Sequence, residues 1–144
     1  MRIEAACAAA LATTFAIGFT ACGGGGGGAP LSPSPGPSQP GQPAATVTIT
    51  AAGVSPRTVR IEPGQSVRFE NNDTQAHVPS SDPHPTHTDC PAINAAGTLA
   101  PGASRDTAAL PAARSCGFHD HNNPDDDRFR GQIVVGDGPE MPGY

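Results

Sequence analysis

Histidine and cysteine residues are concentrated in one part of this 144-residue chain, and both side chains bind metal ions. The chain has five histidines and four cysteines, and imidazole and thiolate are ligands that copper and zinc prefer. All five histidines and two of the cysteines lie in one segment, which random scatter would rarely produce. The pattern therefore predicts a metal site. Its candidate members are His77, His84, His87, Cys90, Cys116, His119 and His121.

Three of these residues form a set that suits copper. We interpret Cys116-x-x-His119 as a short turn that holds two ligands close together, and His77 follows the strand-and-turn sequence SVRFENNDTQAH. A thiolate with two imidazoles from separate loops is a trigonal copper set, so these three residues are the predicted ligands of one copper ion, with zinc less favoured. Asp89 and Asp120 flank candidate ligands and are expected to orient imidazoles. The candidate additional ligands are His84, His87 and His121.

The N-terminal residues carry export signals. Arg2, an apolar run and small residues before Cys22 follow the plan of a secretory signal peptide. The sequence FTAC at residues 19–22 resembles a bacterial lipobox, in which the cysteine is acylated, although Phe19 stands where leucine is usual. Residues 1–22 are therefore predicted to be a signal peptide with lipidation at Cys22, and an ordinary cleaved signal peptide is the alternative.

A linker separates this signal from the part of the chain that can fold. Glycines and then spaced prolines fill residues 23–45, and such a sequence cannot bury a core, so it is predicted to be a disordered linker. The folded domain is predicted at residues 46–138, with a tail at 139–144. A tether after a lipidated cysteine suits a solvent-facing domain anchored in the cell envelope or periplasm, with the lipid as its only membrane contact.

Cys90 gives Cys116 a second candidate role. Removal of the signal peptide removes Cys7, and acylation occupies Cys22, so two cysteines remain in an oxidising compartment. Such a pair normally forms a disulfide. A Cys90–Cys116 bridge would abolish the thiolate ligand and leave any metal to the histidines. The sequence leaves both alternatives open.

Short segments with alternating apolar residues predict the framework that must position these side chains. Turn sequences such as EPG and NND separate them, and no segment has a helical apolar stripe. Period-two patterning at this spacing predicts an all-β fold, an antiparallel β-sandwich. The long polar stretch at residues 78–96 is typical of a functional or disordered loop. The predicted strands lie in TVTIT (46–50), TVRI (58–61), SVRFE (66–70), GTLAPGAS (97–104) and GQIVVGDG (131–138).

The order of these segments resembles a cupredoxin, the plastocyanin and azurin type of blue-copper domain. VRIEPGQSVRFENNDTQAH, a LAPGAS strand, CGFH and GQIVV follow one another as in that family, over most of residues 45–138. The resemblance implies a Greek-key β-sandwich that carries one copper ion and shuttles single electrons. Carried over by position, it implies His77, Cys116 and His119 as the copper ligands.

The chain departs from that family pattern at two places. Phe129 stands two residues before Gly131, where the family usually has a weak methionine ligand, and phenylalanine cannot bind copper. His121 is a candidate replacement for that ligand or a solvated loop residue. His84 and His87 crowd the loop after the first predicted ligand, where they are extra ligands, ligands of a second ion, or ordinary polar residues.

Together these features predict a membrane-anchored, copper-binding, cupredoxin-like monomer that transfers single electrons to a redox partner protein. The alternatives are a copper storage or delivery protein with a copper-exchange partner, and a disulfide-stapled binding module without redox activity. An enzyme is less favoured because the chain has no nucleophile-elbow motif and no phosphate-binding loop. The net charge of −5 and the absence of a basic cluster argue against a nucleic-acid partner.

Overall fold

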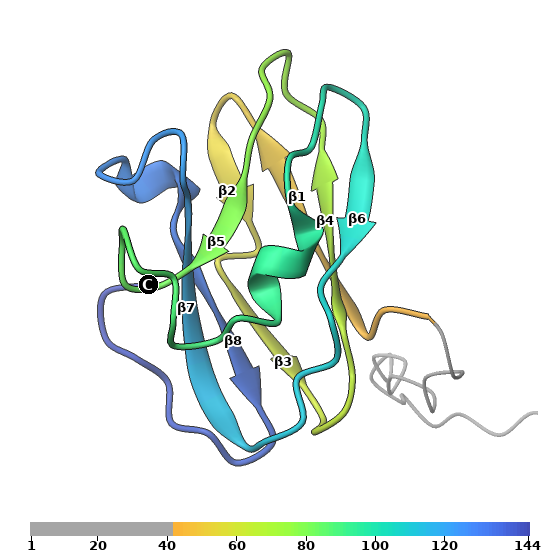
Figure 1. Cartoon of the computed structure of the whole chain (residues 1–144), viewed down its shortest axis with the longest axis vertical. Helices are drawn as coiled ribbons and strands as arrows, with labels where there is room; N and C mark the ends of the chain where they lie inside the picture. Colours follow the sequence, from red (N-terminus) through yellow and green to blue (C-terminus); the bar gives the residue numbers. More distant parts are fainter. Residues whose placement is uncertain (1–41) are drawn as a thin grey trace, which may run out of the picture. The chain divides into compact units, whose positions relative to one another are not determined.

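The computed structural model describes residues 42–144, which form two four-stranded sheets packed face to face (Figure 1). The predicted signal peptide, Cys22 and nearly all of the predicted linker lie outside the described residues. The first sheet has the order β2 (Gly53–Ser55), β1 (Ala45–Thr50), β4 (Val67–Asn71), β6 (Ser104–Asp106). The second sheet has the order β3 (Thr58–Ile61), β8 (Gly131–Val135), β7 (Arg114–Asp120), β5 (Pro79–Ser81). Two short 3₁₀ helices are η1 (Ile93–Ala96) and η2 (Asp127–Phe129).

The predicted β-sandwich is confirmed. TVTIT, TVRI, SVRFE and GQIVV form the main parts of β1, β3, β4 and β8. In each sheet one pair of strands runs parallel, β1 with β4 and β3 with β8, and the remaining pairs are antiparallel. Among residues 42–144, no helix is long and apolar enough to cross a bilayer.

The core lies between the two sheets and is built from alternate residues of the strands. Val47 and Phe69 of the first sheet and Ile133 of the second are fully buried, as the period-two pattern requires. Phe69 meets Phe118 edge to face across the sandwich, with the ring centroids 5.1 Å apart. Burying a side chain of this size stabilises the fold by roughly 1.5–3 kcal/mol, so these residues supply much of its cohesion.

The interpretation of CGFH as a short turn is wrong, because residues 114–120 form the strand β7. β7 pairs with β8 on one edge and with β5 on the other, so its backbone groups are satisfied as in a central strand. The apolar alternation that marks other strands is limited here to Cys116 and Phe118, because both faces of the carboxyl-terminal half of β7 are buried and the polar residues His119 and Asp120 occupy part of them. A pattern search for one apolar face therefore overlooks this strand.

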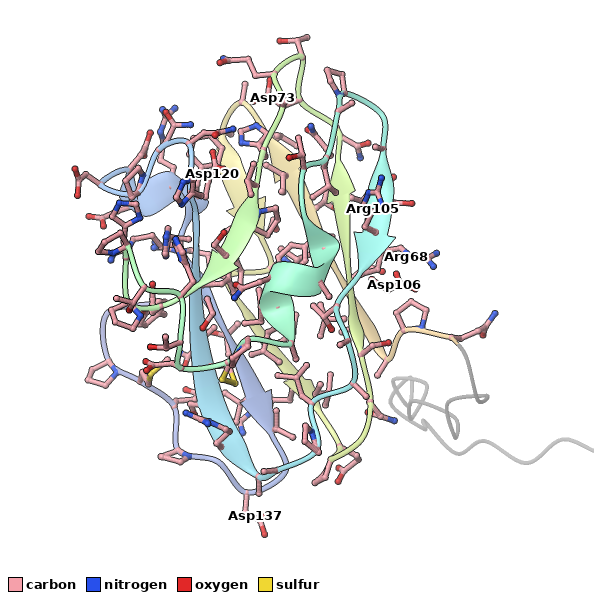
Figure 2. The ribbon with its side chains drawn as sticks, in the orientation of Figure 1. Arg68, Asp73, Arg105, Asp106, Asp120 and Asp137 are labelled. Atoms are coloured by element: carbon pink, nitrogen blue, oxygen red, sulfur yellow. A yellow bond between two sulfur atoms is a disulfide. The ribbon has the colours of Figure 1, made fainter. Side chains whose placement is uncertain are left out.

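A disulfide joins β7 to the loop that follows β5. Cys90 and Cys116 are bonded to each other with their Cα atoms 5.7 Å apart, and Figure 2 shows the bond in yellow among the side chains of the domain. Both half-cystines are buried, and Cys116 is fully inaccessible. In this oxidised form Cys116 has no thiolate to offer a metal.

Candidate metal centre

The alternation of side chains along β7 separates the predicted ligands. Successive residues of a strand point to opposite faces of its sheet. Cys116, Phe118 and Asp120 therefore share one face, which is the interior because Phe118 packs on the opposite sheet. Gly117 and His119 lie on the other face. Cys116 and His119 are three residues apart on an extended strand, so they cannot bind one ion together.

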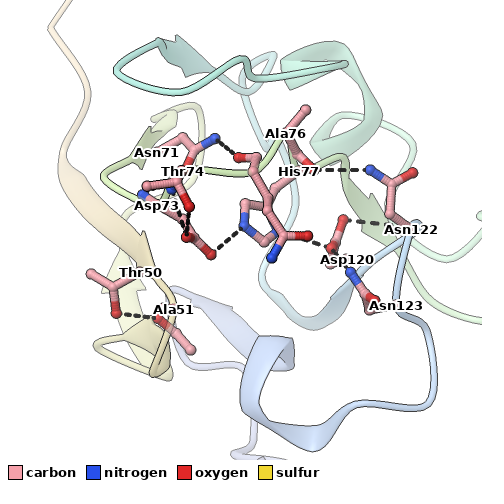
Figure 3. Close-up of polar contacts among 12 residues, drawn as sticks. Thr50, Ala51, Asn71, Asp73, Thr74, Ala76, His77, Asp120, Asn122 and Asn123 are labelled. Atoms are coloured by element: carbon pink, nitrogen blue, oxygen red, sulfur yellow. Dashed lines mark hydrogen bonds and ion pairs between the residues drawn. The ribbon is translucent and has the colours of Figure 1, made fainter.

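His77 is held inside the domain by two carboxylates (Figure 3). Its Nδ1 lies 2.9 Å from Asp120 Oδ2 and its Nε2 lies 3.1 Å from Asp73 Oδ2. All three side chains are at most 4 % exposed. Each ring nitrogen of His77 therefore already faces a carboxylate oxygen at hydrogen-bond distance, so neither nitrogen points into an open ligand position.

The two carboxylates are held in their ionised forms. The hydrogen bond from His77, followed by one from the Thr74 backbone, lowers the pKa of Asp73. Burial alone would raise the pKa of Asp120, but hydrogen bonds from the Val78 backbone, Asn123 and His77 together lower it. Asp120 thus orients an imidazole as expected, and the imidazole is that of His77.

Because folding lowers the pKa values of Asp73 and Asp120, the stability of the domain depends on pH. Groups whose pKa falls on folding stabilise the native state fully above their unfolded pKa, near 3.9 for aspartate, and lose that effect as pH drops through the folded value. The contribution of these two carboxylates to the urea midpoint should hold from pH 7 to about pH 5 and be lost below about pH 4. The Asp120→Asn variant should lose less between pH 5 and pH 2 than the wild type. An equal acid response of the two chains would contradict this assignment.

The other four histidines come together on the outer face of the second sheet. One nitrogen from each lies within 4.8 Å of the corresponding nitrogen of every other, and the ring centroids recorded for these residues are 4.9–5.5 Å apart. This group of imidazoles, called the four-histidine cluster below, consists of His84, His87, His119 and His121.

Strand β7, the turn after it and one loop supply the cluster. His119 lies on the outward face of β7, and His121 is the first residue of the turn that follows, where its N–H donates to Val78 O at 2.9 Å. His84 and His87 lie in the loop after β5. That loop is closed at its base by Asp89 N–H, which donates to Asp82 O at 2.9 Å.

His87 is placed by several specific contacts. Its Nδ1 donates to Ser81 O at 2.9 Å, and its Nε2 faces the cluster and lies within hydrogen-bond distance, 2.9 Å, of His121 Nδ1. Asn94 of η1 donates to His87 O at 2.9 Å. Among the described non-glycine residues, His87 alone has a positive φ, 52°. Such a conformation costs on the order of 1 kcal/mol and is concentrated at functional sites.

Among the four histidines, His119 has the geometry that most clearly indicates metal binding. Its side chain is 1 % exposed, and Nδ1 lies 2.7 Å from Asp82 Oδ1. The other nitrogen, Nε2, is buried without a hydrogen-bond partner among the described residues, which normally costs free energy. Burial lowers the pKa of His119, and Asp82 only partly offsets this effect. A neutral ring with an unpartnered Nε2 is the form that binds a metal ion.

The cluster fits one metal ion in size and in chemistry. Imidazole nitrogens bind copper or zinc at about 2.0 Å, so two of them on opposite sides of one ion are about 4 Å apart. The separations of up to 4.8 Å therefore need only a small contraction, and two of the contributing rings are exposed enough to move. Four imidazole nitrogens suit Cu²⁺ or Zn²⁺ as ligands.

The structure thus groups the candidate residues differently from the predicted set. His119 joins the three residues named only as additional ligands, while His77 and Cys116 lie on the interior side of β7 in separate interactions.

Sequence reasoning did not find Asp82 as the partner of His119. The spacings His84-x-x-His87 and His119-x-His121 were the available signals for the cluster. Phe129, at the position of the family methionine, packs on His77 with ring centroids 4.9 Å apart.

Comparison with known proteins supports the fold. No protein-family model and no curated protein matches the chain. A purple cupredoxin from Nitrosopumilus maritimus is 18% identical over 64% of this chain and 99% of its own, with a TM-score of 0.50. Amicyanin from Paracoccus versutus is 16% identical over 68% and 85%, with a TM-score of 0.52. Plastocyanin from Dryopteris crassirhizoma is 16% identical over 63% and 99%, with a TM-score of 0.50.

At these identities the likeness is one of backbone architecture. It agrees with the two-sheet strand order described above and with the resemblance that the sequence motifs carry. Residues 42–144 of this chain therefore have the cupredoxin fold.

Proposed function

We propose that this protein binds one copper ion through the four-histidine cluster and transfers single electrons in the cell envelope. The observation that carries the proposal is the convergence of four imidazoles around the buried Nε2 of His119, which has no hydrogen-bond partner in the described part of the chain. Copper is favoured over zinc because nitrogen sites bind Cu²⁺ more tightly, and because the chain resembles proteins that carry copper. When bound, copper would supply a one-electron couple.

The protein's own side chains would do the remaining work. His87, His119 and His121 would hold the ion, with His84 completing the set from the exposed edge. The backbone carbonyl of Ser81 and the carboxylate of Asp82 would fix the ring orientations, since each accepts from a ring N–H that does not face the cluster. Because no thiolate belongs to this cluster, we expect a pale Cu²⁺ complex instead of an intense blue one.

The predicted location supports the same function. A lipid on Cys22 and a linker would tether the domain at a membrane surface, where it could meet a redox partner protein. We propose that the domain acts there as a monomer.

Copper delivery is the second candidate function. His84 and His121 are exposed and His87 is partly exposed, so an incoming ligand from a partner protein could reach the ion directly. A site that exchanges copper needs such access, whereas an electron carrier needs a rigid site that keeps its ion. The exposed edge of the cluster is the specific observation that favours delivery.

The test is a titration of the full chain with Cu²⁺ and with Zn²⁺ against a chelator of known affinity. We expect one Cu²⁺ per chain and an electron paramagnetic resonance spectrum with nitrogen coupling. Replacing His119 with Gln should weaken Cu²⁺ by more than the 10- to 100-fold typical for loss of a hydrogen-bond partner of a ligand. Asn122→Ala, beside His121 but outside the cluster, is the matched control and should bind normally.

The outcomes separate the candidate functions. No Cu²⁺ binding by the wild type would refute the metal site. A reversible one-electron couple with slow copper loss supports electron transfer, and rapid transfer of copper to a chelator without a stable couple supports delivery. Normal binding by His119→Gln would show that the ion binds elsewhere.

A further inference from the structure

The last six residues of the chain pack along the outer face of the second sheet and end beside the four-histidine cluster. Met141 N–H donates to Gln132 Oε1 at 2.8 Å, and Gln132 Nε2 donates to Met141 O at 3.2 Å. Glu140 pairs with Arg60 at 2.5 Å. Gln132 is 2 % exposed and faces Gly117 across the β7–β8 pair. Contacts at Glu140 and Met141 therefore hold this segment on the sheet and fix the path that leads to Tyr144.

That final residue, Tyr144, reaches the partner of the buried ligand. Its hydroxyl donates to Asp82 Oδ2, while the other oxygen of the same carboxylate accepts from His119 Nδ1 at 2.7 Å. Burial, followed by the hydrogen bond to Asp82, raises the pKa of Tyr144 to about 12. The phenol is therefore protonated at neutral pH and acts as a donor to the carboxylate.

Strand β7 has a glycine, Gly117, beneath Asp82 and Tyr144, where a side chain would block their contact. A Cβ on Gly117 would lie 2.5 Å from the Tyr144 hydroxyl oxygen and would also collide with Asp82 Oδ2. Real Cβ atoms essentially never approach other atoms so closely. The absence of a side chain at this position lets the carboxylate and the phenol lie directly on β7, next to His119.

We infer that Asp82 and Tyr144 are positioning residues of the metal site, and that Tyr144 acts on the metal only through Asp82. Asp82 holds the hydrogen of His119 on Nδ1, so the lone pair is on Nε2, which has no hydrogen-bond partner within residues 42–144. The Tyr144 hydroxyl fixes the carboxylate in the orientation that reaches His119. This inference rests on the proposed copper site, and it makes the C-terminal residue a part of that site.

A double-mutant cycle on the full chain tests the inference through Cu²⁺ affinity, measured by competition with a chelator. Asp82→Ala should weaken binding about 10- to 100-fold, as loss of a ligand's hydrogen-bond partner typically does. Tyr144→Phe should weaken it about 3- to 10-fold in the wild-type background. In the Asp82→Ala background Tyr144→Phe should have no further effect. Glu140→Gln, in the same segment, is the control and should leave the affinity unchanged.

A second measurement does not depend on metal. Nitrogen-15 NMR of the metal-free full chain should show His119 with its hydrogen on Nδ1 in the wild type, and a shift toward the other tautomer in Asp82→Ala. The inference is overturned if the tautomer is unchanged, or if Tyr144→Phe costs the same affinity in both backgrounds or none in either. A wild-type chain that binds no copper but shows the Nδ1–H tautomer would overturn the proposed function while leaving the positioning of His119 by Asp82 intact.

Discussion

The double variant Cys90→Ser, Cys116→Ser is expected to bind one Cu²⁺ per chain with the wild-type spectrum, while its free energy of unfolding falls by about 3.5 kcal/mol. The bridge closes a loop with a sequence separation of 26, and the chain-entropy model assigns this loss to the larger conformational freedom of the unfolded variant. The spectrum should not change, because Cys116 lies on the interior side of β7 and His119 on the other side.

This experiment separates the two roles that the sequence left open for Cys116. Copper spectra give the ligand set, and urea unfolding of the metal-free full chain gives the stability. The single variant Cys90→Ser is a useful comparison, since it frees Cys116 as a thiol without removing it. An intense visible band in copper-loaded Cys90→Ser, absent from the double variant, would show that Cys116 can serve as a ligand once the bridge is gone. Loss of copper from a folded double variant would contradict the four-histidine site.

The Asp120→Asn variant is expected to lose about 1–3 kcal/mol of stability, because it disturbs several hydrogen bonds to one buried carboxylate. Asp120 is 3 % exposed and accepts from His77, from the Val78 backbone at 2.8 Å and from Asn123 at 2.8 Å. The asparagine side chain would either set an N–H donor against one of these donors or accept more weakly than the carboxylate. Either change leaves a buried polar group with a weaker partner.

Urea unfolding at pH 7 measures the effect. Asp126→Asn is the matched control, because the Asp126 carboxylate also accepts hydrogen bonds, from Arg128, but its side chain is 30 % exposed. Exposed pairs contribute little, so this variant should unfold close to the wild type. Equal stability of Asp120→Asn and Asp126→Asn would show that the His77 network is not a structural core element. Lost copper binding in a folded Asp120→Asn chain would instead favour a metal site at His77.

Asp73 and Asp120 hold the His77 ring in the interior, where the family resemblance implied that His77 binds copper. His77 lies at the end of the strand-and-turn segment, as the motif SVRFENNDTQAH predicts. Its ring meets Asp73, Asp120 and Phe129, and none of these supplies a thiolate or thioether. The interior end of the sandwich is therefore built from charge-assisted hydrogen bonds, while the metal-binding chemistry of the histidines is gathered on the outer face.

Much of the framework was predictable from the sequence, because strand formation leaves a local signature. Val47 and Ile49, or Val67 and Phe69, alternate with polar residues, and this period matches a strand with one buried face. β7 was not found because both faces are buried at its carboxyl end, where His119 and Asp120 are polar but covered. Composition also singled out the segment that holds every histidine.

Residue pattern and composition were enough to predict the fold class, the candidate ligand types and the pair of cysteines available for a bridge. Which histidines meet became clear only from the three-dimensional fold. Ligand spacing is a one-dimensional property, whereas membership of a site depends on which face of a strand each side chain occupies. The odd spacing of Cys116 and His119 places them on opposite sides of β7, and the loop after β5 brings His84 and His87 to the outer side. Those long-range placements come from strand pairing and the disulfide, neither of which is visible in local sequence.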